Sequence, residues 1–209
     1  ASVCREAGIP IAGGHSIDCP EPVYGLAVIG TCPTAQIKRN SQARKGDLLI
    51  LTKGLGIGIY SAAIKKEKLS DEAYREMVAS TTLLNRIGTQ LGAHPAVSAL
   101  TDVTGFGILG HSLEMARGSG STIRLDLKAL PLLSQAHALA QAGFVTGASH
   151  RNWKSYRDGI VLPEGLDEAS RHVMTDPQTS GGLLVAVAPD AAYELVSHIC
   201  ASGYPLANI

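Results

Sequence analysis

Three short apolar runs stand out along the chain, each bounded by polar or glycine-rich residues. They cover residues 48–52, 96–100 and 183–188. Continuous apolar runs of this length are typical of buried strands. Apolar residues elsewhere recur at helical spacing, which predicts helices over 59–66, 71 to about 86, about 106–117, 132–141 and 190 to about 201. Strands and helices interleave, so we expect a layered α/β or α+β domain with a mixed sheet covered by helices.

The first 46 residues carry a different pattern. Residues 1–7 end at Gly8 and are predicted to be the last turns of a helix. Residues 9–12 and 23–32 are predicted to be strands. Residues 33–46 are polar and basic, which is typical of a domain boundary.

Two further segments and the chain ends complete the pattern. Residues 122–126 alternate like a half-exposed strand, and residues 144–169 are expected to be irregular. The first helix has no N-cap before it, and the last residues, 205–209, stop inside what reads as a strand. We therefore expect this chain to be a piece of a longer protein.

Composition narrows the classes of function. Of the 209 residues, 45% are hydrophobic, which is enough for a substantial core. The 18 basic and 18 acidic side chains cancel and aromatic residues make up only 4%, so we expect no binding to nucleic acid or to an anionic membrane. No apolar run reaches the ~18 residues of a transmembrane helix. The four cysteines form no CxxC pair, and reduced thiols predict a cytoplasmic protein.

Two glycine-rich segments are candidates for ligand contact. Lys53–Gly58 separates a predicted strand from a predicted helix, where glycines let backbone N–H groups approach a phosphate. It matches neither the Walker A nor the GxGxxG pattern, and the alternative is close packing permitted by the glycines, with a solvated Lys53. In Gly13–Ser16, small residues allow a planar ligand to approach, and His15 and Ser16 add hydrogen-bonding groups. The alternative there is a tight turn with a surface histidine.

The segment TDVTGFG places one acidic residue, Asp102, at the end of a predicted strand. An Asp beside a glycine loop and a helix start can hold a hard cation near phosphate. Because Mg²⁺ also needs phosphate oxygens and water, the alternative is an Asx-turn in which Asp102 accepts from the amides of Thr104 and Gly105. His111, in the following helix, is expected to be a buried histidine with a backbone partner rather than a ligand.

The segment Asp176–Gly182 places polar groups directly before the last predicted strand. Alone it is explained by turn chemistry, because Asp-Pro opens a turn and Gly-Gly lets the chain reverse. No Ser-His-Asp or Cys-His arrangement is indicated by the spacing of the residues.

Taken together and in order, these segments identify a protein family more specifically than any one of them does. The series GGHSIDCPEP, KGDLLILTKGLGIG, TDVTGFGILGH and DPQTSGGLL resembles the selenophosphate synthetase (selenide, water dikinase) family. That family belongs to the superfamily that includes aminoimidazole ribonucleotide synthetase. TDVTGFG together with DPQTSGG is highly specific for it, whereas KGLGIG alone is not. The likeness runs from the first residues to the last.

The resemblance implies an α+β chain of two domains. Residues 1–45 would be the remnant of an N-terminal α/β domain that binds ATP and forms the dimer. Residues 46–209 would be most of a C-terminal domain, in which a mixed sheet is flanked by helices, incomplete at its C-terminus. The full-length protein is expected to be a homodimer.

The resemblance also implies an ATP-dependent phosphotransferase, a kinase-type enzyme that makes selenophosphate, AMP and phosphate from ATP, selenide and water. The product would serve selenocysteine and seleno-tRNA biosynthesis. By resemblance, Asp102 matches the Mg²⁺-binding Asp of the family. Gly14, His15 and Ser16 match the segment that contacts ATP from the partner subunit. His111 and Asp176–Gly182 match family motifs without an assigned chemical role.

No catalytic residue is assigned in this chain. The reactive Cys or selenocysteine of the family, its nearby Lys and several Asp residues belong to a segment that precedes Ala1 in the family pattern. The cysteines of this chain, Cys4, Cys19, Cys32 and Cys200, lie outside the matching motif. We therefore expect the 209-residue chain to be inactive by itself, with Asp102 as one ligand of a site completed by other groups.

Two alternatives remain open. One is another ATP-dependent member of the superfamily acting on a different acceptor, such as aminoimidazole ribonucleotide synthetase or thiamine-phosphate kinase. The other is a non-catalytic relative that serves as a binding or dimerisation module.

Overall fold

The computed structural model describes residues 1–209. The chain forms two compact units, residues 1–37 and residues 38–209. In the first unit, helix α1 (Ser2–Ala7) ends at Gly8 in the left-handed conformation, as expected. Residues 9–12 and 23–32 form no strand, and no residue of this unit is buried. A strand needs a neighbour that satisfies its N–H and C=O groups, and this unit supplies none. The boundary expected at residue 45 stays a prediction.

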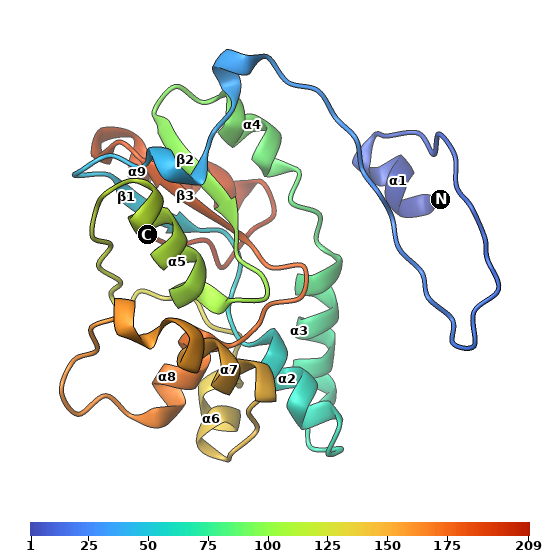
Figure 1. The fold of residues 1–209 in the computed structure, drawn as a ribbon, viewed down its shortest axis with the longest axis vertical. Coiled ribbons are helices and arrows are strands. Elements are labelled where there is room, and N and C mark those ends of the chain that lie inside the picture. Colours follow the sequence, from blue (N-terminus) through green and yellow to red (C-terminus); the bar gives the residue numbers. More distant parts are fainter. The chain divides into compact units, whose positions relative to one another are not determined.

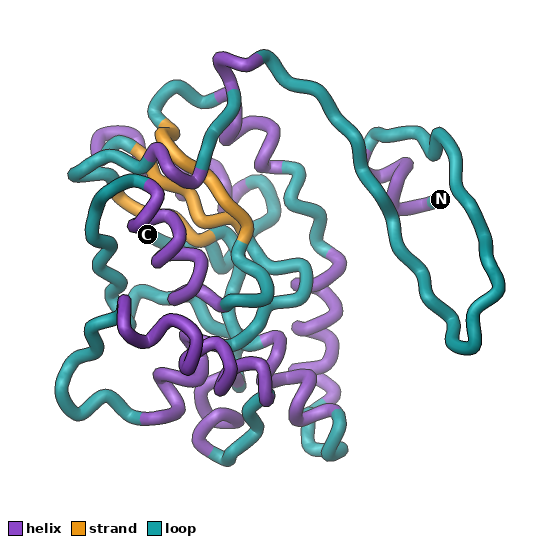
Figure 2. Tube along the Cα trace, in the orientation of Figure 1, coloured by secondary structure: helices purple, strands orange, loops and turns teal.

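A three-stranded sheet occupies the second unit (Figure 2). Its strands are β1 (Leu48–Leu51), β2 (Val97–Asp102) and β3 (Leu183–Val187). The order is β1-β3-β2, and β3 is antiparallel to both neighbours. Because both outer strands oppose β3, they run in the same direction and their carboxyl ends lie at one edge of the sheet.

The α+β class is confirmed, with one difference in the sheet. All strand pairs are antiparallel rather than mixed, and the one parallel pairing is an isolated bridge between Leu55 and Leu132. The strand expected over residues 122–126 does not form. Ile123 and Leu125 still turn toward the core while their neighbours are exposed, so the alternating pattern survives without a pairing partner.

Helices cover both faces of the sheet (Figure 1). The bounds of the helices in this unit are α2 Ile57–Ile64, α3 Asp71–Thr82, α4 Ile87–Ala93, α5 Gly107–Gly118, α6 Ala136–Gln141, α7 Gly147–Tyr156, α8 Glu168–Thr175 and α9 Pro189–Ala201. Short 3₁₀ turns cover Thr34–Gln36, Asn40–Gln42 and Arg157–Gly159. None of the helices combines the length and the apolar character needed to cross a bilayer.

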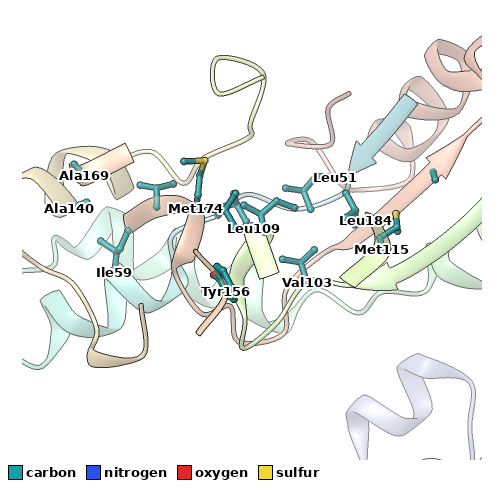
Figure 3. Close-up of a cluster of buried hydrophobic side chains, with 14 of the residues drawn as sticks. Leu51, Ile59, Val103, Leu109, Met115, Ala140, Tyr156, Ala169, Met174 and Leu184 are labelled. Carbon is teal, nitrogen blue, oxygen red and sulfur yellow. The ribbon is translucent and has the colours of Figure 1, made fainter. Parts of the chain in front are cut away.

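Strand β3 contributes to two cores because alternate side chains point to opposite faces. Leu184 and Ala186 pack with α5, α7 and α8, and Figure 3 shows this cluster around Leu109, Tyr156 and Met174. On the other face, the odd-numbered residues of β3 pack with α4 and α9. All five side chains of β3 are buried, which explains its continuous apolar sequence.

The region 144–169, expected to be irregular, contains α7 and the start of α8. Each helix begins at a side-chain cap: Thr146 accepts from the amide of Ser149, and Asp167 accepts from the amide of Ser170. These two N-cap residues are the local sequence features that indicate the starts of α7 and α8. The apolar spacing is weak here because α7 buries small and polar residues against its neighbours.

Candidate functional site

Three loops meet where β1 and β2 end and β3 begins. They are Thr52–Gly58 after β1, Val103–Gly107 after β2 and Asp176–Gly182 before β3. We call this edge of the sheet the loop edge. It brings together the three glycine-containing motifs that the sequence analysis singled out in this unit.

Backbone hydrogen bonds lock the loops to one another. The Val103 amide donates to the Gly182 carbonyl (2.8 Å), and the Gln178 amide donates to the Thr104 carbonyl (2.9 Å). Gly107 has a φ of 68°, and a Cβ there would lie 2.8 Å from the carbonyl oxygen of Met174. The glycine is therefore required both by the backbone conformation and by the close approach of the chain before Asp176.

Asp176 and Gln178 close the start of α2. The Oδ2 atom of Asp176 accepts from the amides of Gly58 (2.8 Å) and Ile59 (3.2 Å). The Oε1 atom of Gln178 accepts from the amides of Gly56 (3.2 Å) and Ile57 (3.3 Å). These side chains satisfy four free N–H groups of the helix terminus. The close-packing alternative therefore describes this glycine-rich loop, because its amides from Leu55 to Gly58 are already bonded within the chain.

The Asp176 carboxyl is fully buried, and its Oδ1 atom has no hydrogen-bond partner. Burial raises the pKa of Asp176 to about 7, although the two backbone amides and the Gln178 side chain act in the opposite direction. A carboxyl group in this position changes charge near neutral pH.

Lys53 is buried, which corrects the alternative of a solvated lysine. Its Nζ atom donates to the carbonyl oxygens of Leu83 (2.6 Å), Ser180 (2.8 Å) and Ser80 (3.2 Å). Desolvation lowers the pKa of this ammonium to about 8. Lys53 thus ties the carboxyl end of α3 to the loop before β3.

Asp102 is the exposed acidic residue of the loop edge. It is the last residue of β2, opposite Leu183, and its carboxylate makes no hydrogen bond within the chain. The Asx-turn with the amides of Thr104 and Gly105 is not formed. The carboxylate is therefore free to bind a ligand.

The oxygen donors at the loop edge determine whether Mg²⁺ could bind there. A single exposed carboxylate fits one position of an octahedral oxygen shell. The chain contains no group of three or more His, Cys, Asp or Glu side chains that could hold a metal ion. Asp102 therefore suits a shared site, in which phosphate oxygens, water or other carboxylates complete the shell.

His111 is buried in α5, and its partners are side chains rather than the expected backbone group. Its Nδ1 atom lies 3.1 Å from Oε2 of Glu114, and its Nε2 atom lies 3.5 Å from Oγ1 of Thr104. The ring also packs against Phe106, with centroids 5.6 Å apart. His111 thus supports the loop after β2 from inside.

Two residues of α7 support the same loop, and the sequence analysis missed both. Asn152 donates through Nδ2 to the carbonyls of Gly105 (2.8 Å) and Thr175 (3.0 Å). The Tyr156 hydroxyl donates to the carbonyl of Phe106 (2.8 Å). The N-cap Thr146 is a local signal for the start of α7. No local signal indicates the contacts of Asn152 and Tyr156, because they join residues 47 and 50 positions apart in the sequence.

Gly14, His15 and Ser16 belong to the first unit. All three are exposed, and the side chains of His15 and Ser16 make no hydrogen bond within the chain. Their assignment as ATP contacts stays a prediction, as does the metal-binding role of Asp102.

Comparison with known proteins shows which family and which proteins the chain is similar to. Residues 44–209 match the family described as AIR synthase related protein, C-terminal domain. The chain is 61% identical over its whole length to a selenide, water dikinase of Rhizobium meliloti (strain 1021), and covers 60% of that protein. It is 55% identical over 94% of its length to a selenide, water dikinase of Burkholderia pseudomallei (strain K96243), of which it covers 55%. The resemblance expected from the four segments is thereby confirmed.

Solved structures agree on the fold alone. Escherichia coli HypE matches with a TM-score of 0.60 and 21% identity, over 82% of this chain and 45% of that chain. Thiamine-monophosphate kinase from Stenotrophomonas maltophilia K279a matches with a TM-score of 0.52 and 19% identity, over 80% of this chain and 47% of that chain.

Proposed function

Because the chain belongs to the AIR synthase related family through its C-terminal domain, we propose that the full-length protein is a selenophosphate synthetase. The observation that carries this proposal is the 61% identity, over every residue of the chain, to a selenide, water dikinase. The chain spans about 60% of the length of that relative, so the proposal concerns the full-length protein.

The proposed reaction converts ATP, selenide and water into selenophosphate, AMP and phosphate. Phosphoryl transfer of this kind depends mainly on positioning and on electrostatic stabilisation of phosphate charge. Bound Mg²⁺ supplies that neutralisation. The protein's share is to hold oxygen ligands and nucleotide contacts in a fixed geometry.

We assign one metal ligand to this chain, Asp102. Its carboxylate is exposed and unbonded, while the backbone beneath it is anchored to Gly182 through the amide of Val103. The loop that follows is held by Asn152, which donates to the carbonyl of Gly105, and is contacted by His111 at Thr104. A free carboxylate on a rigid support loses little freedom when it binds a cation, which favours this position over a flexible one.

The nucleotide contacts are proposed for Gly14, His15 and Ser16, acting on ATP bound by the partner subunit of a homodimer. The exposed imidazole of His15 and hydroxyl of Ser16 supply hydrogen-bonding groups, and Gly14 leaves room for close approach. This assignment makes dimerisation a condition for activity.

The test is ATP turnover by the full-length protein. With selenide and Mg²⁺, we expect AMP and phosphate to form together with selenophosphate, which ³¹P NMR detects. Turnover with aminoimidazole precursors or thiamine phosphate instead of selenide would favour another branch of the superfamily. Absence of turnover with every acceptor would favour a binding or dimerisation module.

A residue-level test uses Asp102→Asn in the full-length protein, with the exposed Asp158→Asn as matched control. Loss of one ligand charge is expected to lower Mg²⁺-dependent turnover at least ~100-fold, whereas the control keeps it. The melting temperature of both variants should stay near that of the parent protein, because Asp102 makes no hydrogen bond within the chain. Unchanged turnover by Asp102→Asn would remove Asp102 from the metal site.

We also propose that the 209-residue chain is inactive alone, since its loop edge carries a single exposed carboxylate and no cluster able to hold a metal by itself. Selenide-dependent AMP production by the purified chain would overturn this.

A further inference from the structure

The buried side chains of α7 all carry a hydrogen-bonding group. They are Ser149, Asn152 and Tyr156, and each of them bonds to a residue outside the helix. A buried polar group lowers stability unless its donors and acceptors find partners, so an apolar face would be the simpler way to pack a helix. The polar face of α7 therefore indicates a requirement beyond packing.

Two of these side chains hold successive carbonyl groups of the loop after β2. Asn152 donates through Nδ2 to the carbonyl of Gly105 (2.8 Å). The Tyr156 hydroxyl donates to the carbonyl of Phe106 (2.8 Å). The carbonyl before them, that of Thr104, accepts from a backbone amide of the segment before β3 (2.9 Å). Three consecutive carbonyls of the loop are thus held by buried residues.

These bonds determine where the neighbouring N–H groups point. In a trans peptide the C=O and the following N–H point in opposite directions, and the chain contains no cis peptide bond. The N–H groups of Gly105 and Phe106 therefore point away from the groups that hold the carbonyls before them. Neither N–H donates a hydrogen bond within the chain, and both residues are exposed. The loop thus presents two free donors directly after the strand that ends in Asp102.

We propose that Asn152 is a positioning residue for phosphoryl transfer. It holds the peptide between Gly105 and Phe106 so that the Phe106 N–H donates to a phosphoryl oxygen of ATP beside Asp102. This inference rests on the proposed function. Donors that are fixed before the reaction stabilise charge on a phosphoryl group without having to reorganise. The carboxylate of Asp102 cannot do this directly, because it repels the phosphoryl oxygens.

The second N–H of the Asn152 amide fixes the side chain itself. Nδ2 also donates to the carbonyl of Thr175 (3.0 Å), the last residue of α8. Both hydrogens of the amide are therefore used, and the side chain cannot turn without losing two bonds. Ser149 bonds to the Thr175 hydroxyl (2.6 Å) but makes no hydrogen bond to the loop after β2. Ser149 is thus a matched control for an effect on stability alone.

Amide NMR of the full-length protein tests the donor. Phe106 and Phe144 are the two phenylalanines of this chain, and the Phe144 amide donates to the Leu139 carbonyl (3.0 Å). With [¹⁵N]phenylalanine, Phe106→Leu and Phe144→Leu assign the two signals. Adding Mg²⁺ and the non-hydrolysable analogue AMP-PNP should move the Phe106 signal downfield, because its N–H gains a charged acceptor, while the Phe144 signal stays. A Phe106 signal that stays in place when the nucleotide saturates the protein would overturn the proposal.

Asn152→Leu tests the positioning role. It keeps a similar volume and removes both donors, so the Phe106 shift should be lost and selenide-dependent turnover should fall at least ~10-fold. Ser149→Ala should lower the melting temperature by a comparable amount and keep both the shift and the turnover. Retention of both by Asn152→Leu, or their loss in Ser149→Ala, would assign Asn152 to stability alone. The Phe106 shift in the parent protein remains a test even where Asn152→Leu does not fold.

The positioning role and the proposed function fail in different ways. Absence of turnover with selenide in the parent protein refutes the proposed function, whereas the Phe106 shift with AMP-PNP is measured without selenide. Normal turnover with an unmoved Phe106 signal refutes the positioning role and leaves the proposed function intact.

Discussion

The buried carboxyl of Asp176 makes the stability of this unit depend on pH in an unusual direction. Burial raises its pKa to about 7, from an ordinary value of 3.8. In the unfolded chain the carboxyl loses its proton near pH 4, whereas in the folded chain it keeps the proton to about pH 7. Between these values the folded state binds more protons, so the free energy of unfolding falls as pH rises.

The magnitude follows from the size of the shift. A rise of about three units corresponds to about 4 kcal/mol in total. Over the accessible interval from pH 5 to pH 8, Asp176 should contribute a loss of about 3 kcal/mol. Asp176→Asn removes the charge and keeps an oxygen that can accept from the amides of Gly58 and Ile59. This variant should lack that loss.

The measurement is urea unfolding at pH 5, 6, 7 and 8, followed by the fluorescence of Trp153, the single tryptophan of the chain. The difference in unfolding free energy between Asp176→Asn and the parent is the quantity to plot, because other titrating groups cancel in it. We expect it to rise by about 3 kcal/mol from pH 5 to pH 8. Asp158→Asn, in an exposed position, should give a flat difference. A flat difference for Asp176→Asn as well would refute the reasoning.

Two further predictions concern packing at the loop edge. Gly107→Ala should cost at least ~2 kcal/mol, because its φ of 68° and the Met174 carbonyl leave no room for a Cβ, whereas Gly105→Ala, with open space around it, should stay within ~0.5 kcal/mol. Thermal unfolding checks this, and equal melting temperatures would contradict it. Lys53→Met should cost about 3 kcal/mol, because three carbonyls lose their donor, while the exposed Lys65→Met should be neutral. Urea midpoints of the two variants should differ accordingly, and coincident midpoints would show that the Lys53 contacts contribute nothing.

The sequence predicted the strands of the sheet because their signal is local. Residues 48–52, 96–100 and 183–188 are continuous apolar runs, and each overlaps a strand in the structure. The same holds for the helix that begins after Ser70, whose side chain accepts from the amide of Ala73. A strand buried on both faces and a helix N-cap can each be recognised from a few consecutive residues of the sequence.

The contacts of the loop edge could not be predicted because they join distant segments. Asp176 reads as the start of a turn, and its bond to the Gly58 amide spans 118 residues. Lys53 reads as a surface cation, and only the fold shows the three carbonyls around it. The strands expected at 9–12 and 23–32 failed for a related reason, since strand propensity without a pairing partner forms no sheet.

The placement of β3 also constrains the order in which the protein can be made. The last strand in the sequence is the central one of the sheet, and β1 and β2 are each paired with it and not with each other. During synthesis, β1 and β2 leave the ribosome before the strand with which they pair, Leu183–Val187, has been made. Because β3 follows directly on Asp176–Gly182, the segment that closes α2 and supports Asp102 arrives together with it. The loop edge is therefore assembled in one late, long-range step, and nascent chains that stop short of β3 present two unpaired apolar strands to chaperones.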